Sequence, residues 1–194
     1  MNDIAAKWDA RYAAAPLEST RPAWLLEQFA HLLPPSGDAL DLACGLGGNA
    51  LWLARRGFAV RAWDLSAVAI ERLGSEAART GVAVAAVVRD AAALASVDAG
   101  FDVIVVAHFL DRSVIPALRA AVRPGGLVFY QTYTRERRAL ASGPSNPDFL
   151  LQPNELLTLF AGWRILLYRD EGQVGDLSLG QRDLAYLVAR KPVT

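Results

Sequence analysis

The sequence is poor in the residues that form disulfides and metal centres. It contains one cysteine and two histidines among 194 residues. A single cysteine cannot form an intrachain disulfide, and the two histidines show no metal-ligand spacing with the carboxylates. We therefore expect a domain that contains no metal and is stabilised by its hydrophobic core.

Net charge and long apolar runs are absent as well. Twenty basic and twenty acidic residues give a formal net charge of +0 at pH 7. Such a chain lacks the basic surface that binds nucleic acid or an anionic membrane. No stretch approaches the roughly 18 uninterrupted apolar residues of a membrane span, and the first residues contain no apolar signal core. These absences predict a cytoplasmic protein, a monomer or homodimer, whose partner is a small molecule.

The composition is that of a globular domain. Hydrophobic residues make up 53% and charged residues 21% of the chain, and this length predicts one domain with a full core. We expect N-terminal helices within residues 1–36 and the core of the domain within residues 37–194.

From Ala39 onward, apolar runs alternate with helical patterns, which predicts parallel strands joined by right-handed crossover helices. Strands are expected at 38–43, 58–63, 82–88, 101–107 and 126–133, and helices at 3–14, 48–56, 66–79, 113–121 and 153–160. Another helix is expected to begin at Pro22 and to end before Pro34. Ser66 and Ser113 are candidate N-caps, and Gly81 is a candidate C-cap.

Two later strands are expected at 163–168 and 184–189. The polar stretch between them has no helical pattern. Strands joined without a crossover helix are typically antiparallel.

Residues 39–50 carry the strongest functional signal, because an apolar run leads into a glycine-rich turn and then into a helix. Gly45 and Gly47 have no Cβ atom, so a ligand can approach their backbone closely. Asp64 follows Gly45 by nineteen residues and ends the next apolar run. An acid at that place accepts hydrogen bonds from ribose hydroxyls.

Two ligands fit this pattern: a nicotinamide dinucleotide and S-adenosylmethionine. The run from Gly45 to Ala50 matches the G-x-G-x-x-A pattern of dinucleotide sites. Asp41 would repel a pyrophosphate, but it suits the ammonium and sulfonium groups of S-adenosylmethionine. The alternative role of Asp41 is that of a turn carboxylate bonded to nearby amides.

Four segments, in their order and spacing, resemble the motifs of the class I S-adenosylmethionine-dependent methyltransferases. Asp41–Gly47 resembles motif I, 62–66 the second motif, 89–91 the segment that meets the adenine, and 123–127 the turn before the fifth strand. The resemblance covers about residues 37–190, and its nearest branch is the small tellurite-resistance-like and thiopurine-like enzymes. It implies a Rossmann-like α/β domain with helices on both faces of a seven-stranded, mostly parallel sheet whose last strand is antiparallel.

The resemblance also implies S-adenosyl-L-methionine as the cofactor. Asp64 would accept hydrogen bonds from the ribose, Asp90 from the adenine amino group, and Asp41 would lie near the methionyl ammonium. The implied cofactor-binding residues are Tyr12, Asp41, Ala43, Cys44, Gly45, Gly47, Asp64, Leu65, Asp90, Ala91 and Ala107.

Further candidates flank this site. His108 ends the fourth predicted strand, and in such methyltransferases the end of that strand borders the sulfonium. His108 is therefore our candidate catalytic residue, and the alternative is a ring that only fills space beside the cofactor. Trp8 and Tyr12, four residues apart, share a helix face next to Arg11. That cluster is either a cofactor lid or a simple docking surface. Residues 134–152 are either a substrate-side loop or an exposed connector.

The expected activity is methyl transfer from S-adenosylmethionine to a small-molecule acceptor. No acid–base pair is recognisable, so we expect proximity and orientation to supply the catalysis, as for a soft thiol or chalcogen nucleophile. Residues 172–182 lack the histidine associated with tellurite-type enzymes, which disfavours that substrate. Two alternatives are a nicotinamide-dependent oxidoreductase and a non-catalytic module that binds adenosylmethionine.

Overall fold

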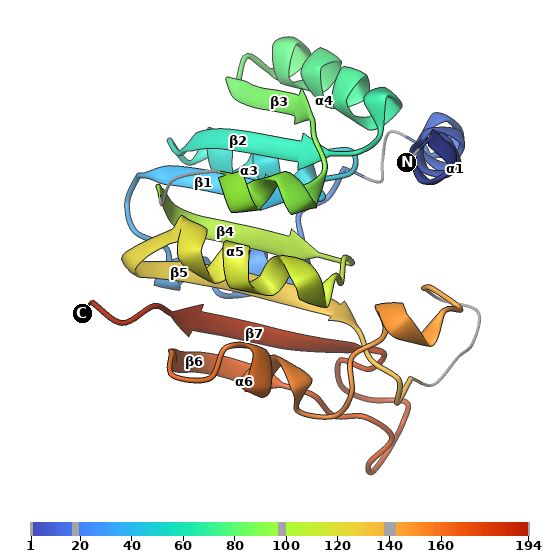
Figure 1. Ribbon diagram of the computed structural model, residues 1–194, viewed down its shortest axis with the longest axis vertical. Coiled ribbons are helices and arrows are strands. Elements are labelled where there is room, and N and C mark those ends of the chain that lie inside the picture. Colours follow the sequence, from blue (N-terminus) through green and yellow to red (C-terminus); the bar gives the residue numbers. More distant parts are fainter. Residues whose placement is uncertain (1, 17–19, 97–99, 138–142, 194) are drawn as a thin grey trace.

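The computed structural model describes residues 2–16, 20–96, 100–137 and 143–193. The strands are β1 (Asp38–Leu42), β2 (Ala59–Asp64), β3 (Val84–Val88), β4 (Phe101–Ala107), β5 (Val122–Tyr133), β6 (Arg164–Arg169) and β7 (Leu184–Arg190). They form a seven-stranded sheet in the order β3-β2-β1-β4-β5-β7-β6 (Figure 1). β7 is antiparallel to both of its neighbours, and the pairs from β3 to β5 are parallel. The predicted fold class is confirmed, including the antiparallel last strand.

Helices cover both faces of this sheet. They are α1 (Asn2–Ala14), α2 (Trp24–Gln28), α3 (Gly48–Arg55), α4 (Ala67–Thr80), α5 (Ile115–Ala121) and α6 (Glu155–Leu159), with short 3-10 helices η2 (Ala30–Leu32), η3 (Ala91–Ser96), η4 (Arg112–Val114) and η5 (Pro147–Phe149). Helices α2, α3 and α4 contribute to the core on one face, and α5 and α6 to the core on the other. No helix in the described part of the chain combines the length and the apolar content needed to cross a bilayer.

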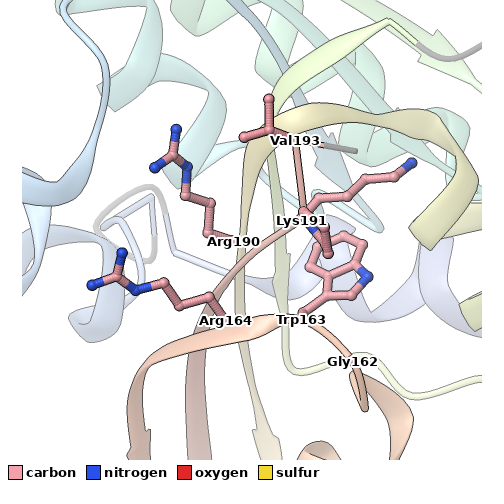
Figure 2. A pocket seen from close by; sticks show the side chains of 7 residues that line it. Gly162, Trp163, Arg164, Arg190, Lys191 and Val193 are labelled. Atoms are coloured by element: carbon pink, nitrogen blue, oxygen red, sulfur yellow. The ribbon is translucent and has the colours of Figure 1, made fainter.

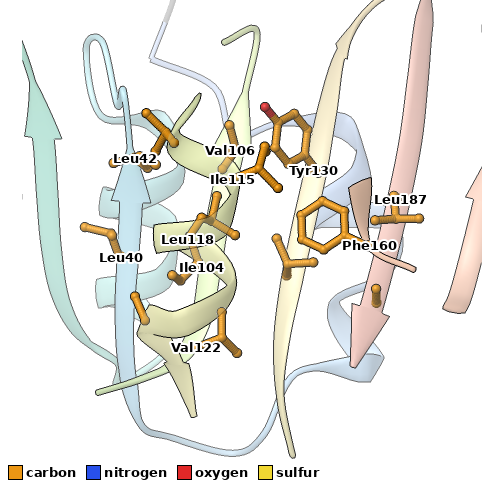
Figure 3. Close-up of a cluster of buried hydrophobic side chains, with 14 of the residues drawn as sticks. Leu40, Leu42, Ile104, Val106, Ile115, Leu118, Val122, Tyr130, Phe160 and Leu187 are labelled. Atoms are coloured by element: carbon orange, nitrogen blue, oxygen red, sulfur yellow. The ribbon is translucent and has the colours of Figure 1, made fainter. Parts of the chain in front are cut away.

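The two cores follow from the alternation of side chains along a strand. In β1, Leu40 and Leu42 belong to the same buried cluster as Leu118 of α5 (Figure 3). Ala39 belongs to the opposite core with α3 and α4. Each buried leucine stabilises the fold by roughly 1.5–3 kcal/mol relative to exposure. The same alternation places Asp41 on the face that α3 covers.

Two predicted caps are confirmed and one is wrong. Ser66 caps α4 by accepting a hydrogen bond from the Ala69 N–H, and Gly81 ends that helix with a φ of 71°. Ser113 does not act as an N-cap. Asp111 caps η4 instead, because its carboxylate accepts from both the N–H and the hydroxyl of Ser113.

Most predicted ends lie within two residues of the observed ones, with two exceptions. β5 begins at Val122 rather than at 126, because Val122 already pairs with Phe101 of β4. The helix expected from Pro22 begins at Trp24 and spans only 5 residues. Of the predicted loop 134–152, residues 138–142 lie outside the described part of the chain.

Candidate functional site

The site expected from the sequence lies where successive helices change sides of the sheet. β1 and β4 are adjacent and parallel. However, α3, which follows β1, and α5, which follows β4, pack on opposite faces. In α/β folds, ligands bind at such a switch point, outside the carboxyl ends of the strands.

The backbone is strained at this point. Ala43 and His108 directly follow β1 and β4, and their φ angles are 55° and 58°. A left-handed conformation costs a non-glycine residue roughly 1–2 kcal/mol. Such residues cluster at ligand sites, where the surrounding structure holds them in place. The pair therefore marks the ends of β1 and β4 as the candidate site.

The two glycines of the turn have different neighbours. A Cβ atom on Gly47 would lie 2.2 Å from the side chain of Leu73, so this glycine allows α4 to pack closely against the turn. A Cβ atom on Gly45 would lie 2.8 Å from the hydroxyl of Tyr12. Tyr12 of α1 therefore covers the turn at Gly45.

Asp64 connects the turn to the start of α4. One carboxylate oxygen accepts from the Gly45 N–H at 2.8 Å, and the other accepts from the Ser66 N–H at 2.9 Å. The residue is 6% exposed. Burial raises the pKa of this carboxyl, and its hydrogen bonds oppose that rise. Each oxygen keeps acceptor capacity, because an ionised carboxylate offers about four lone-pair sites.

Asp41 points toward α3. Its two oxygens accept from the side-chain amide of Asn49 at 3.1 Å and from the Ala50 N–H at 3.0 Å. Burial is the main cause that raises the pKa of this carboxyl to about 7, against the two hydrogen bonds. These bonds are those of a turn carboxylate. Contact between Asp41 and a cofactor ammonium remains a prediction.

The residues expected beside the adenine follow β3. One oxygen of Asp90 accepts from the Ala92 N–H at 2.8 Å and so begins η3. Ala91 is buried, while Leu65 at the end of β2 is half-buried. The β2–β3 pairing brings the ends of these two strands together, since Asp64 is the register partner of Val88.

Cys44 lies inside the turn and is buried. Burial raises the pKa of its thiol, and the nearby carboxylates Asp41 and Asp64 raise it further. A protonated thiol is a poor nucleophile. These properties disfavour a nucleophilic role for Cys44, and its contact with the cofactor through its backbone remains a prediction.

His108 lies at the end of β4, beside Ala107 and opposite β5. Its N–H donates to the Gln131 carbonyl at 2.9 Å, and its ring lies 5.4 Å from that of Tyr133. Surrounding protein removes part of the solvent from the imidazole and lowers its pKa, and Arg11 of α1 lowers it further. The lowered pKa favours the neutral form of the His108 imidazole.

Two polar residues of this region were not anticipated. Asn49 joins Asp41 to the chain before α2, since its oxygen accepts from the Ala23 N–H at 2.8 Å. Asp9 of α1 bonds to the start of α4 through Ser66. The sequence contains no signal for Asn49, whereas the neighbours Trp8 and Tyr12 mark the segment that contains Asp9. Those two rings stack at 5.7 Å, so the predicted shared face is confirmed.

A surface cavity of about 510 Å³ lies at the opposite edge of the sheet. It is formed where β6 begins and β7 ends, and Arg164 and Arg190 extend side by side from these strands (Figure 2). Lys191 points away, with its ammonium bonded to carbonyls at the end of α5. This cavity is separate from the candidate site, which lies at the carboxyl edge.

Comparison with known proteins decides between the two candidate ligands. A methyltransferase-domain family matches residues 39–126. Two ubiquinone biosynthesis O-methyltransferases, from Xanthomonas axonopodis pv. citri and Caulobacter vibrioides, are each 31% identical to this chain over 74% and 77% of its length. The chain belongs to the S-adenosylmethionine-dependent methyltransferases. Its cofactor is S-adenosylmethionine, and the nicotinamide alternative is rejected.

The chain spans 62% of the Xanthomonas methyltransferase and 67% of the Caulobacter one. Among solved structures, TehB from Haemophilus influenzae shares the fold with a TM-score of 0.69 at 21% identity, over 92% of this chain and 63% of that one. The branch expected within the methyltransferases stays a prediction.

The buried Asp41 predicts a pH dependence of stability. Its carboxyl has an ordinary pKa of 3.8 when unfolded and about 7 in the fold. Between these values the folded state holds the extra proton, so rising pH favours unfolding. Asp41→Asn is neutral throughout and should remove this loss of stability, which is on the order of a few kcal/mol.

Urea unfolding of both proteins, in steps from about pH 4.5 to 8, measures the difference. As pH rises, the free energy of unfolding of Asp41→Asn should increase relative to that of the wild type. Asp64, whose pKa is also raised, is present in both proteins, so the difference between the two profiles reports mainly on Asp41. Parallel profiles would contradict the assignment.

Proposed function

We propose that this chain transfers a methyl group from S-adenosylmethionine to a small-molecule acceptor at the carboxyl ends of β1 and β4. The observation that carries the proposal is the position of Asp64. Backbone N–H groups on both sides hold its carboxylate in place, and each oxygen keeps a site for a ribose hydroxyl. The neutral charge of the chain favours a small acceptor over a nucleic acid.

The adenosine part of the cofactor is proposed to lie across the ends of β2 and β3. Asp64 would accept hydrogen bonds from the ribose. Asp90 would accept one from the adenine amino group, and Ala91 would offer its backbone N–H to a ring nitrogen. Leu65 would supply an apolar contact beside them.

The methionine part is proposed to lie along the turn 43–47. Ala43 and Gly45 would offer their backbone groups to it. Asp41 would hold the turn in place through its hydrogen bonds to Asn49 and Ala50. Tyr12 lies over Gly45, so α1 would cover this part of the cofactor. Ala107, at the end of β4, would face the methyl group that is transferred.

The acceptor is proposed to bind beside His108 and Tyr133. Methyl transfer is an in-line displacement: the sulfur–methyl bond breaks while the acceptor donates the electron pair of the new bond. The protein must align the acceptor and exclude water. An ionised acceptor has already lost its proton, whereas a neutral one must give its proton to a base. His108 would take that proton.

Two acceptor chemistries are proposed. The sequence shows no recognisable acid–base pair, which favours a soft thiol or chalcogen that needs no base. The names of the relatives favour an oxygen acceptor, and so does the position of His108 beside Tyr133 at the end of β4, because a hydroxyl acceptor must lose a proton.

Asp64→Ala should weaken the binding of S-adenosylhomocysteine at least about tenfold, since charge-assisted hydrogen bonds contribute roughly 1.5–3 kcal/mol each. Calorimetric titration measures the affinity, and a thermal melt checks that the variant still unfolds cooperatively. Asp111→Ala is the matched control, because it removes an exposed carboxylate at the same edge of the sheet. Unchanged affinity in a folded Asp64→Ala protein would refute the ribose assignment.

His108→Ala separates the two acceptor chemistries. For an ionised thiol series, turnover should fall only modestly, and the pH midpoint should follow the pKa of each thiol. For a phenol, loss of a general base should cost roughly 10²–10⁴-fold. Product analysis by mass spectrometry also tests the non-catalytic alternative, since a protein that forms no methylated product from either series would be a binding module.

A further inference from the structure

Helix α1 is attached to the domain without entering its core. It lies at the carboxyl edge of the sheet, near the start of α4 (Figure 1). None of residues 3–14 is buried, and Ile4 is 58% exposed. A short helix that buries so little apolar surface gains little from the hydrophobic effect. Its position therefore depends on polar contacts.

The first polar contact is made by Asp9. One oxygen of its carboxylate accepts from the Ser66 hydroxyl at 2.5 Å and from the Val68 N–H at 3.2 Å. The Val68 N–H is among those that the first turn of a helix leaves without an intrahelical partner. A carboxylate is also favoured at the positive end of the helix dipole. Asp9 thus adds a second cap to α4, from another helix.

The second contact is made by Arg72 of α4. Its guanidinium donates to the carbonyl of Tyr12 and, at 2.9 Å, to that of Ala15. These carbonyls lie at the C-terminal end of α1, where a helix leaves acceptors unpaired and favours a cation. Together, Asp9 and Arg72 fix the C-terminal half of α1 on α4.

The Asp9 contact leads directly to the proposed cofactor site. Ser66 donates its hydroxyl proton to Asp9 and its N–H to Asp64. Asp64 in turn holds the Gly45 N–H. Tyr12, three residues after Asp9, lies over that same Gly45. Asp9 is therefore connected to the glycine-rich turn both through hydrogen bonds and through the helix that carries it.

We propose that Asp9 is a positioning residue that holds α1 over Gly45 and thereby sets how long the cofactor stays bound. The inference rests on the cofactor site proposed above. Because none of residues 3–14 is buried and the bonds of Asp9 and Arg72 hold α1 in place, the helix can detach while the sheet stays folded. Detachment would uncover Gly45, and reattachment would cover it again.

The test uses the full chain with Asp9→Ala, and with Asp3→Ala as the control for an exposed carboxylate on the same helix. Hydrogen exchange of residues 3–14 is measured without cofactor. Stopped-flow binding then gives association and dissociation rates for S-adenosylhomocysteine. Asp9→Ala should exchange faster in α1 and release the ligand about tenfold faster, with a similar association rate. Asp9→Asn, which keeps an acceptor oxygen, should give a smaller effect, and Asp3→Ala none.

The outcomes are distinct. If α1 exchanges in Asp9→Ala at the same rate as in the wild type, Asp9 does not anchor the helix. Faster exchange with unchanged ligand release would show that α1 does not retain the cofactor. A lower association rate together with faster exchange in the sheet would indicate general damage to the site, and would also overturn the proposal. If the wild type itself binds no S-adenosylhomocysteine, the proposed function fails, while the exchange comparison still decides whether Asp9 anchors α1.

Discussion

Two buried carboxylates constrain the whole carboxyl edge of the sheet. Asp41 is 1% exposed and Asp64 is 6% exposed, and a buried carboxylate is tolerated only where hydrogen bonds replace water. Asp41 takes its donors from the first turn of α3, so it fixes where that helix begins. Asp64 takes the N–H groups of Gly45 and Ser66, so it fixes the turn relative to α4. These hydrogen bonds connect the turn to both helices, and α1 packs against the turn and α4.

Much of this arrangement could be predicted from the sequence because it depends on local patterns. The alternation of apolar runs and helical segments predicts parallel strands. The lack of a crossover helix before residues 184–189 predicts that the last strand is antiparallel. Ser66 and Gly81 act as caps through contacts within a few residues of themselves. The spacing of Asp64 from Gly45 placed the acid at the end of the strand next to the turn, and the two do bond directly.

Other features depend on contacts between segments far apart in the chain, which local patterns do not encode. Asp9 and Ser66 are 57 residues apart, and no spacing rule connects them. The alternation of side chains along β1 does not determine whether the Asp41 carboxylate faces a ligand or a helix. In the fold its hydrogen-bond donors come from Asn49 and Ala50 of α3. The left-handed backbone conformation of His108 could not be predicted either, because no glycine occupies that position. Ser113 and Asp111 are both good N-cap residues, and the choice between them depends on where η4 begins.

We propose that the turn between β1 and α3 holds S-adenosylmethionine in a site formed around Asp64. Calorimetric titration of the purified protein with S-adenosylhomocysteine, and in parallel with oxidised nicotinamide adenine dinucleotide, tests it most directly. We predict one bound S-adenosylhomocysteine per chain. At about a hundred times the dissociation constant, that ligand should stabilise the fold by about 2.7 kcal/mol. Binding of the dinucleotide, with no heat from S-adenosylhomocysteine, would contradict the account.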